Sequence, residues 1–260
     1  MSQVSFIILA RNEEHQISEC IESVQKFQIA DEILLIDDLS TDRTAEIAEG
    51  LGAKIIQHSM NGDWGAQWNF AISQAKFEWI FFIDADERMT EKLAKHLRKI
   101  VDENDQRFAY NVTRLNYFYG QKLKHGGWFP DYALRLFPKE GVHVEGFIHQ
   151  TTHHPREEKN LPLDEFMIHY SYRDWDHYFK KFESYTTMAA RKMQSEGKSA
   201  SLLDILIRPA WASFRMYVLR LGFLDGKIGF FLAMFHFFYT MVKYVKLIYL
   251  SEQKKDRGSI

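Results

Sequence analysis

Three groups of polar residues could do chemistry, and each directly follows a short apolar run. They are A-R-N-E-E at residues 10–14, D-D-L-S-T-D at residues 37–42 and D-A-D-E at residues 84–87. In the third group, two carboxylates are separated by one residue. Because alternate residues of an extended segment face the same way, Asp84 and Asp86 can address one ligand-bound cation. Solvated or helix-capping acids would explain this motif equally well.

The first two groups suit a nucleotide. Backbone amides at the start of the helix expected after Ala10 could receive a nucleotide, although a plain helix cap is the favoured explanation of this motif taken alone. In the second group, a carboxylate can accept a hydrogen bond from the N–H of a nucleobase, and Ser40 to Asp42 can cap the next helix. Capping does not explain why two acids, Asp37 and Asp38, precede them at the end of a strand.

Alternating strands and helices must position these groups. Strand patterns occupy residues 4–10, 32–37, 53–57 and 79–84, and helical patterns lie between them near 15–25, 42–51 and 65–75. This alternation implies parallel strands joined by right-handed crossovers. In such doubly wound α/β sheets, ligands bind beyond the carboxyl ends of the strands, where all three motifs fall.

The remainder of the chain changes character. Aromatic-rich strand patterns at 107–120 and 132–138 suggest an antiparallel extension of the same sheet, and helix formers dominate 174–197. An apolar helical tail follows over 202–250, with a glycine-rich break at 222–229. Much of the aromatic excess lies in this last third of the sequence.

Composition excludes some functions. With 33 basic and 35 acidic residues, the chain lacks the basic excess of a nucleic-acid-binding protein, so no nucleic-acid partner is expected. The one cysteine, Cys20, can form neither an internal disulfide nor a cysteine-rich metal site, and we expect a buried thiol in a reducing compartment. The first residues show no secretory signal, which predicts a cytoplasmic protein.

The order of the motifs gives a resemblance. A-R-N-E-E, D-D-x-S-T-D, the helix start G-A-Q-W-N and D-A-D-E follow one another as in family 2 glycosyltransferases with the A-type fold, which the chain resembles over essentially its whole length. The downstream motifs resemble the bacterial subgroup that includes lipopolysaccharide inner-core glucosyltransferases. These are G-G-W-F-P-D-Y-A-L-R-L-F, E-G-F-I-H-Q, H-Y-S-Y, K-K-F-E-S-Y-T and R-P-A-W-A-S-F-x-M-Y.

The resemblance implies roles for the donor site. Asp38 would hold the nucleobase, and Asp84 would lie near the ribose or the metal. Asp86 would bind the Mg²⁺ or Mn²⁺ ion that bridges the diphosphate, while Ala10 and Glu13 would flank the nucleoside.

One departure from the family concerns the donor phosphates. The resemblance implies that Asn69, at the start of the helix after residue 65, binds the nucleotide sugar. Related sequences more often carry a basic residue beside this asparagine. Here Trp68 occupies that place. Neutralisation of the phosphates would therefore depend on the metal and on Lys or Arg side chains elsewhere, among which Arg135 is a candidate that could equally lie on a solvated face.

A second departure concerns the catalytic base. The subgroup usually shows His-Glu where this chain has His149 and Gln150, and glutamine cannot act as a base. The nearest replacements are Glu145, which we place first, and Asp131, although each could be a surface acid.

An aromatic residue could contact the sugar. Trp128, in G-G-W, could stack on a sugar face or could be a core tryptophan. The histidines show no zinc spacing, so satisfied or surface histidines are the simpler interpretation.

The expected reaction is inverting transfer of a hexose, glucose in the first instance, from a UDP-sugar to a lipid-linked saccharide such as the lipopolysaccharide core. Two alternatives remain. The acceptor could be a polyprenyl phosphate, which is already anionic and needs no base. The chain could also be a non-catalytic nucleotide-binding assembly subunit, although the intact Asp84 and Asp86 argue against that.

The tail predicts a membrane partner. Residues 228–242 are fifteen residues without formal charge, fewer than the ~20 that an upright spanning helix needs. Flanking Lys227, Lys243 and Lys246 with neighbouring aromatics suit an interfacial helix, so we expect peripheral or monotopic attachment at the cytoplasmic face of the inner membrane. A core or dimerisation helix is the alternative.

The predicted organisation has three parts. Residues 1–105 would form the nucleotide-sugar-binding half of the catalytic domain, and residues 106–172 would form its acceptor-binding and catalytic half. Residues 173–260 would form a helical, membrane-associated region.

Overall fold

The computed structural model describes residues 2–146, 151–172 and 175–257. The chain forms two compact units. The sheet unit comprises Met1–Leu115 and Pro130–Tyr170, and the helical unit comprises Asn116–Phe129 and Ser171–Ile260. Residues 116–129, which the sequence assigns to the acceptor-binding half, therefore group with the C-terminal helices. The functional division into three parts stays a prediction.

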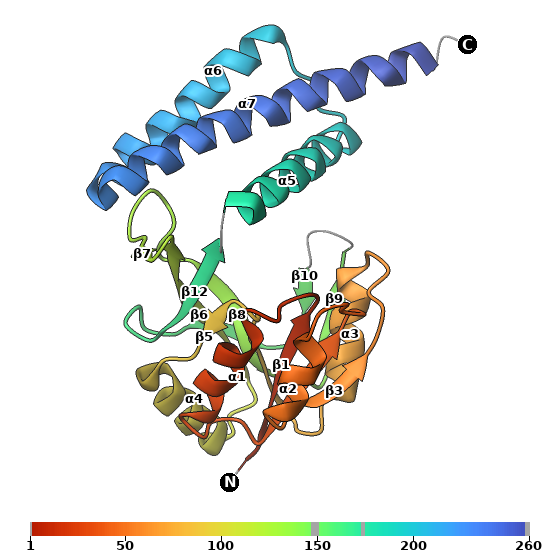
Figure 1. Cartoon of the computed structure of the whole chain (residues 1–260), viewed down its shortest axis with the longest axis vertical. Helices are drawn as coiled ribbons and strands as arrows, with labels where there is room; N and C mark the ends of the chain where they lie inside the picture. Colours follow the sequence, from red (N-terminus) through yellow and green to blue (C-terminus); the bar gives the residue numbers. More distant parts are fainter. Residues whose placement is uncertain (1, 147–150, 173–174, 258–260) are drawn as a thin grey trace. The chain divides into compact units, whose positions relative to one another are not determined.

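The first half of the sheet is parallel, as predicted. Strands β1 (Val4–Ala10), β2 (Glu32–Asp37), β3 (Lys54–Gln57) and β4 (Trp79–Phe82) lie in the order β3-β2-β1-β4. They alternate along the chain with α1 (Ile17–Gln25), α2 (Thr44–Gly50) and α3 (Trp64–Gln74) (Figure 1). Each of these elements lies within about two residues of its predicted bounds. Strand β4 ends at Phe82, so Ile83 and Asp84, which were predicted to belong to it, follow the strand.

Both faces of this sheet are covered, which explains its continuous apolar strands. Phe6 and Ile8 of β1 pack in one cluster with residues of α1, α2 and α4 (Glu91–Glu103). Ile7, on the opposite face, packs in a second cluster with residues of α3. Successive side chains of a strand point to opposite faces, so β1 serves both clusters.

The second half of the sheet is mixed. Strand β8 (Tyr132–Pro138) pairs antiparallel with β4, and β6 (Phe108–Phe118) pairs antiparallel with β8, which confirms the predicted extension. The sheet continues through β12 (Phe166–Tyr172) to β5 (Glu87–Arg88). The short strands β7 (Gln121–Lys122) and β11 (Glu157–Asn160) also pair with β6. Strands β9 (His143–Glu145) and β10 (Thr151–His153) form a separate two-stranded antiparallel sheet.

The strand order creates a place for a ligand. The chain proceeds outward from β1 to β2 and β3, then returns to the other side of β1 as β4. At such a switch point, the loops after the two neighbouring strands diverge to opposite faces and leave a crevice at their carboxyl ends. The motifs that follow β1, β2 and β4 therefore meet at one edge of the sheet.

The helical unit contains α5 (Trp175–Ser195), α6 (Leu202–Phe214), a π-helical turn at Arg215–Leu219, a 3₁₀ turn at Gly222–Asp225 and α7 (Gly226–Arg257). Helix α7 packs against both α5 and α6. Gly229, in the first turn of α7, allows the close approach of α7 to the 3₁₀ turn, because a Cβ at residue 229 would lie 1.8 Å from the carbonyl oxygen of Gly222.

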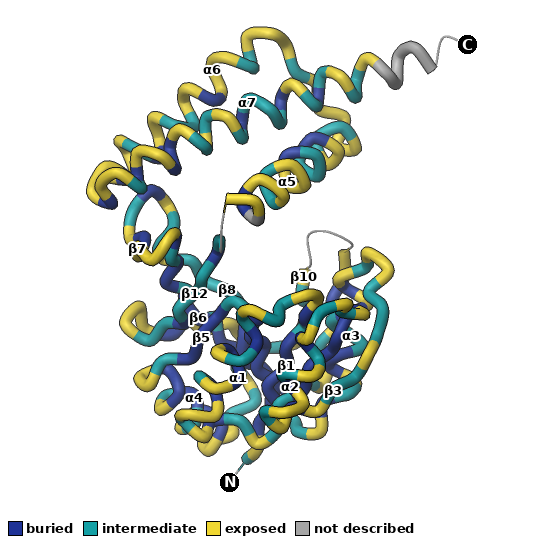
Figure 2. The backbone as a smooth tube through the Cα atoms, in the orientation of Figure 1, coloured by how far each residue is buried: buried dark blue, intermediate teal, exposed yellow. Residues whose placement is uncertain are grey.

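Many apolar residues of the helical unit are exposed. Figure 2 shows stretches of exposed residues along α6 and α7. The segment Gly222–Glu252 is long and apolar enough to cross a membrane by length and composition, although 28% of its most apolar window is buried. Helix α7 is therefore longer than the fifteen-residue uncharged run, because it continues through the lysines on both sides of that run.

One of those lysines faces inward. The ammonium group of Lys246 donates to the hydroxyl oxygens of Thr186 (3.0 Å) and Thr187 (2.6 Å) and to the carbonyl oxygen of Glu183 (3.1 Å). All three acceptors belong to α5. The prediction that Lys246 meets an anionic leaflet is therefore wrong for this structure, since its charge joins α7 to α5.

Candidate active site

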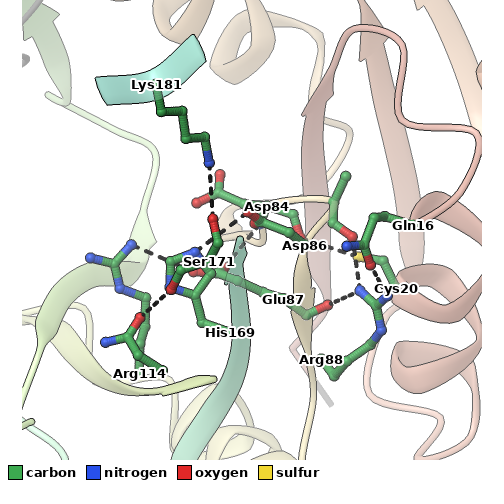
Figure 3. Close-up of polar contacts among 12 residues, drawn as sticks. Gln16, Cys20, Asp84, Asp86, Glu87, Arg88, Arg114, His169, Ser171 and Lys181 are labelled. Atoms are coloured by element: carbon green, nitrogen blue, oxygen red, sulfur yellow. Dashed lines mark hydrogen bonds and ion pairs between the residues drawn. The ribbon is translucent and has the colours of Figure 1, made fainter. Parts of the chain in front are cut away.

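The acidic motif after β4 forms a turn. The backbone N–H of Glu87 donates to the carbonyl oxygen of Asp84 (2.9 Å), and the backbone N–H of Asp84 donates to the carboxylate of Glu87 (2.9 Å). The expectation of an extended segment is therefore wrong, and the period-two argument for Asp84 and Asp86 does not apply. The turn still keeps both carboxylates near each other (Figure 3).

A buried charge network supports this turn. The guanidinium group of Arg135 lies 2.6 Å from Asp84 and 2.5 Å from Glu87. Arg114 lies 3.7 Å from Glu87 and 2.9 Å from Asp131. Glu87 and Arg135 are buried, so their charges must be satisfied within the protein.

The network perturbs the proton affinity of its members. Burial raises the pKa of Glu87 above its ordinary value, and the positive charge of Arg135 acts in the opposite direction. Burial by itself lowers the pKa of Arg135, but the carboxylates of Asp84 and Glu87 raise it above its ordinary value. Arg135 is thus a buried partner of acids, contrary to the alternative that it lies on a solvated face.

The cysteine of α1 contacts the turn after β4. Cys20 is buried, as expected, and its sulfur lies 3.4 Å from the carbonyl oxygen of Asp84. Burial raises the pKa of this thiol, so it stays protonated and can donate to that oxygen.

Asp86 faces a histidine that the sequence interpretation passed over. Nε2 of His169, on β12, lies 3.5 Å from the carboxylate of Asp86, and both side chains are mostly buried. The backbone N–H of Tyr170 donates to the carbonyl oxygen of Asp86 (2.9 Å), which fixes the turn against β12. Figure 3 shows Asp86 and His169 directed toward one another.

These donors fit a divalent ion of the predicted kind. Among the described residues, no group of three or more His, Cys, Asp or Glu side chains could hold a metal by itself. Mg²⁺ typically takes only one or two carboxylates and completes its shell with substrate phosphates and water. Asp86, whose carboxylate lies 3.5 Å from Nε2 of His169, supplies a donor set of that small size.

The loops after β1 and β2 bind each other. The backbone N–H groups of Asn12, Glu13 and Glu14 donate to the side chains of Ser40, Thr44 and Asp42, respectively. The side-chain oxygen of Asn12 accepts from the backbone N–H of Thr41 (2.8 Å). The expectation that these amides receive a nucleotide is therefore wrong, because loop side chains already accept their hydrogen bonds.

The two acids at the end of β2 have different tasks. Asp37 is fully buried and accepts from the backbone N–H of Ser40 (3.2 Å), so it shapes the loop. Asp38 accepts from the backbone N–H of Met60 (2.8 Å) and lies 3.1 Å from the exposed guanidinium group of Arg11. A carboxylate has about four lone-pair sites, so Asp38 keeps capacity for a nucleobase N–H.

Ala10 and Glu13 lie close to Asp38. Ala10 ends β1, and its carbonyl oxygen accepts from the backbone N–H of Asp38 (2.9 Å). Glu13 begins the turn that leads into α1 and is partly exposed. The structure therefore brings together the predicted nucleoside residues at the ends of neighbouring strands. The binding roles themselves stay predictions.

The side-chain amide of Asn69 forms hydrogen bonds with the protein backbone. Its amide group donates to the carbonyl oxygen of Val144 (2.8 Å) and accepts from the N–H of Val144 (2.9 Å). A Cβ at Gly65 would lie 3.1 Å from that same carbonyl oxygen, so α3 and β9 approach closely. Asn69 thus positions β9, and its predicted contact with the donor would have to compete with these bonds.

Trp68 does not replace the basic residue of the related sequences. Its ring stacks on Phe82 with a centroid separation of 3.8 Å and packs in the cluster under α3. Its apolar face is used for the core, which explains the tryptophan at this position.

The two candidate bases differ in environment. Glu145, on β9, is exposed and has Nε2 of His143 at 3.7 Å and Nε2 of His153 at 3.5 Å. Asp131 is held in an ion pair by Arg114, whose backbone N–H also donates to the Asp131 carbonyl oxygen (2.9 Å). Glu145 is therefore the more accessible carboxylate. His149 and Gln150 lie outside the described residues.

Trp128 belongs to the helical unit. Its ring packs against a cluster that includes Phe118, Tyr178 and Met216, with Tyr172 in an edge contact at 6.5 Å. Its indole N–H is buried without a hydrogen-bond partner in the described part of the chain. This packing favours the core interpretation, and the sugar-stacking role stays a prediction.

The sequence contained signals for the acid-binding role of Arg135, which was considered only as a phosphate contact, and for His169, which was given no site role. Arg135 is a single charge inside the otherwise apolar strand Y-A-L-R-L-F, and His169 is a polar residue inside F-M-I-H-Y. A charged or polar residue on a buried strand needs a partner, and here the partners are the acids of the turn.

Comparisons with known proteins agree with this geometry. Residues 5–154 match the family described as Glycosyl transferase family 2. An uncharacterized glycosyltransferase of Rickettsia bellii is 30% identical over 96% of this chain and 88% of its own length. The lipopolysaccharide core biosynthesis glycosyltransferase LpsC of Rhizobium meliloti is 26% identical over 86% of this chain and 82% of its own length.

A solved structure shares the fold. The crystal structure of Staphylococcus aureus TarS, residues 1–349, superimposes with a TM-score of 0.50 at 14% identity, covering 97% of this chain and 92% of that chain. The family match covers more than half of the sequence and includes the loops after β1, β2 and β4. The chain therefore belongs to glycosyltransferase family 2 and is a nucleotide-sugar-dependent glycosyltransferase with a mixed α/β sheet of the A type.

Proposed function

We propose that the protein transfers a hexose, glucose in the first instance, from a UDP-sugar to a hydroxyl group of a lipid-linked saccharide such as the lipopolysaccharide core, with inversion at the anomeric carbon. The observation that carries this proposal is the turn after β4. It holds Asp84 and Asp86 at the switch point of the sheet, beside the strand ends that carry Ala10 and Asp38. The similarity to LpsC supports the class of acceptor.

In this proposal, Asp38 would accept a hydrogen bond from the nucleobase, and Asp86 with His169 would hold a Mg²⁺ or Mn²⁺ ion. When bound, the ion supplies positive charge opposite the diphosphate. The acceptor oxygen bonds to the anomeric carbon as the bond to the diphosphate breaks. The carboxylate of Glu145 takes the hydroxyl proton, a role that its exposure permits.

Membrane attachment belongs to the same proposal. The acceptor is lipid-linked, and the exposed apolar side chains of α6 and α7 would hold the protein at the cytoplasmic face of the inner membrane. The attachment would be monotopic, with α7 lying in the interface.

The first test removes the proposed metal ligand. We expect Asp86→Asn to lower transfer from a UDP-sugar at least about 100-fold, because the charge that develops on the diphosphate loses its counter-charge. Calorimetry should show UDP binding that no longer depends on Mn²⁺. Asp105→Asn, which changes an acid at the surface, is the matched control. Unchanged Mn²⁺-dependent UDP binding in Asp86→Asn would refute the assignment.

The second test concerns the base. Glu145→Gln should lower kcat by about 100-fold or more with little change in the donor KM, because a base acts on the acceptor proton in the transition state. Steady-state kinetics of Glu145→Gln and Asp131→Asn should be compared. If only Asp131→Asn lowers kcat, the two roles are exchanged. If neither does, an acceptor that is already anionic, such as a polyprenyl phosphate, becomes the better proposal.

A further inference from the structure

A cavity of about 490 Å³ lies within the helical unit, between α6 and α7. It is separate from the turn after β4, since all of its lining residues belong to the two helices and the π-helical turn. Its size is in the range of small-ligand sites, which is about 300–1,000 Å³. The proposed transfer reaction gives this cavity no role.

The cavity carries an excess of positive charge. Three cations, Arg208, Arg215 and Lys243, line it together with one acid, Asp204. Asp204 forms an ion pair with Arg208, one turn further along α6. In the described part of the chain, neither Arg215 nor Lys243 forms an ion pair with a carboxylate, so three cations minus one acid leave two net positive charges.

The cations gather around an aromatic ring. The guanidinium group of Arg208 lies 5.3 Å from the ring centroid of Tyr244, and the ammonium group of Lys243 lies 5.1 Å from it. Tyr244 is mostly buried, so it provides a fixed wall between the two charges. Cations from both helices held on one ring form a site for an anion with several oxygens, and arginine suits phosphate because its planar fork can bind two oxygens at once.

The same cavity has an apolar side. Leu203, Ile207 and Trp211 line it at intervals of four residues, so they form one stripe along α6. They are 66%, 62% and 57% exposed, respectively. A free phosphate would leave this stripe in water. A phosphate that carries acyl chains would cover it and meet the cations at the same time.

The sequence motif R-P-A-W-A-S-F-x-M-Y joins these two features. Arg208 begins the motif, Trp211 is its tryptophan and Arg215 occupies its variable position, and all three line the cavity. Pro209, inside α6, is buried and directs its ring away from solvent. The motif that marks the resemblance therefore provides two cations and the aromatic side chain of one site.

We propose that this cavity binds the phosphate group of a membrane lipid, whose acyl chains lie along the Leu203, Ile207 and Trp211 stripe. The proposal rests on the membrane attachment proposed above and goes beyond it. Attachment by exposed apolar side chains requires only a bilayer, whereas this site makes the attachment selective for lipids with an accessible phosphate.

The first experiment measures flotation of the full-length protein with vesicles of phosphatidylcholine, with and without phosphatidate. The test variant is R208Q/R215Q/K243Q. The control is R191Q/K192Q/K198Q, which removes the same charge from exposed positions outside the cavity. We expect wild-type protein and control to bind phosphatidate vesicles at least about tenfold more tightly than neutral ones, and the test variant to lose this preference. A test variant that keeps the preference, or a control that loses it equally, would overturn the proposal.

The second experiment separates a lipid from free phosphate and does not need a bilayer. Short-chain phosphatidate below its micelle concentration should change the fluorescence of Trp211 in a saturable manner, and Trp211→Phe should lose this change. Inorganic phosphate should bind at least about tenfold more weakly, because it covers none of the apolar stripe. If inorganic phosphate binds as tightly as short-chain phosphatidate, the cavity is a site for a soluble anion and not for a lipid.

The two experiments also distinguish this proposal from membrane attachment itself. If wild-type protein ignores all vesicles but binds short-chain phosphatidate, the site exists and the attachment is wrong. If it binds all vesicles alike, and the test variant does the same, attachment stands and the lipid site is wrong.

Discussion

At the scale of single residues, the central feature is a buried arginine that holds two acids of the motif after β4. Arg135 neutralises Glu87, which has no access to solvent, and fixes Asp84 at the edge of the sheet. A buried ion pair of this kind adds little net stability relative to an apolar pair. Removing only one of its partners is strongly destabilising, because the other charge is then buried without a counter-charge. Its role is therefore to position the carboxylates of the turn.

We predict that Arg135→Met lowers the free energy of unfolding by about 3–5 kcal/mol, because it leaves the Glu87 carboxylate buried without its main partner. Urea denaturation followed by tryptophan fluorescence would measure this. The double variant R135M/E87Q should regain most of the loss, since the uncompensated charge is gone. Arg107→Met, at an exposed ion pair with Asp105, should leave the midpoint nearly unchanged. A single variant as stable as wild type would contradict this account.

At the scale of elements, the turn between α6 and α7 depends on close backbone contact. Gly229, in the first turn of α7, lies against the carbonyl oxygen of Gly222, and Asp225 between them accepts from the backbone N–H of His125 (2.9 Å). The turn therefore sets how α7 leaves the 3₁₀ segment, and with it the wall of the cationic cavity.

We predict that Gly229→Ala destabilises the helical unit by at least about 1–3 kcal/mol, because its Cβ would overlap a backbone oxygen that cannot move independently. Gly50→Ala, at the end of α2, is the control, since nothing lies within 4 Å of the added Cβ. It should be neutral or slightly stabilising. Thermal unfolding of both variants would test this, and equal midpoints would show that the turn has room to adjust.

At the scale of the whole molecule, the question is whether α7, which is long enough to span a bilayer, would cross the membrane or lie at its interface. Helix α7 passes the length test for spanning, but its packing against α5 and α6 buries part of its surface. Several of its aromatic side chains, including Phe230, Phe231 and Phe238, are about half exposed. Such a partly covered helix suits the interface better than the centre of a bilayer, where lysines would be costly.

We predict that high salt or carbonate releases a fraction of the full-length protein from vesicles, because monotopic attachment is partly electrostatic. The variant F230E/F231E should bind vesicles at least about tenfold more weakly, since two apolar contacts become charged. Flotation assays would measure both effects, and UDP binding by the same samples would serve as the control. Complete resistance to carbonate would instead identify α7 as a spanning helix.

Local sequence patterns were enough to predict the elements of the first half of the sheet and the edge at which the polar motifs meet. Strands β1 to β4 and helices α1 to α3 were predictable because their apolar periodicity is a local property, and the parallel order follows from their alternation. The meeting of the acidic motifs at one edge was predictable because the strand ends of a doubly wound sheet converge there. The buried state of Cys20 also followed from the apolar pattern around it.

Which polar groups are already hydrogen-bonded within the protein could not be predicted from local patterns. The amides after β1 are satisfied by the loop after β2, the amide of Asn69 by a strand 75 residues away, and Asp84 by an arginine 51 residues away. The tertiary structure also decided that Lys246 binds α5 and that Asp86 meets His169. These pairings join distant parts of the chain, and no local pattern encodes them, because each depends on which buried donors and acceptors the packed fold leaves without water.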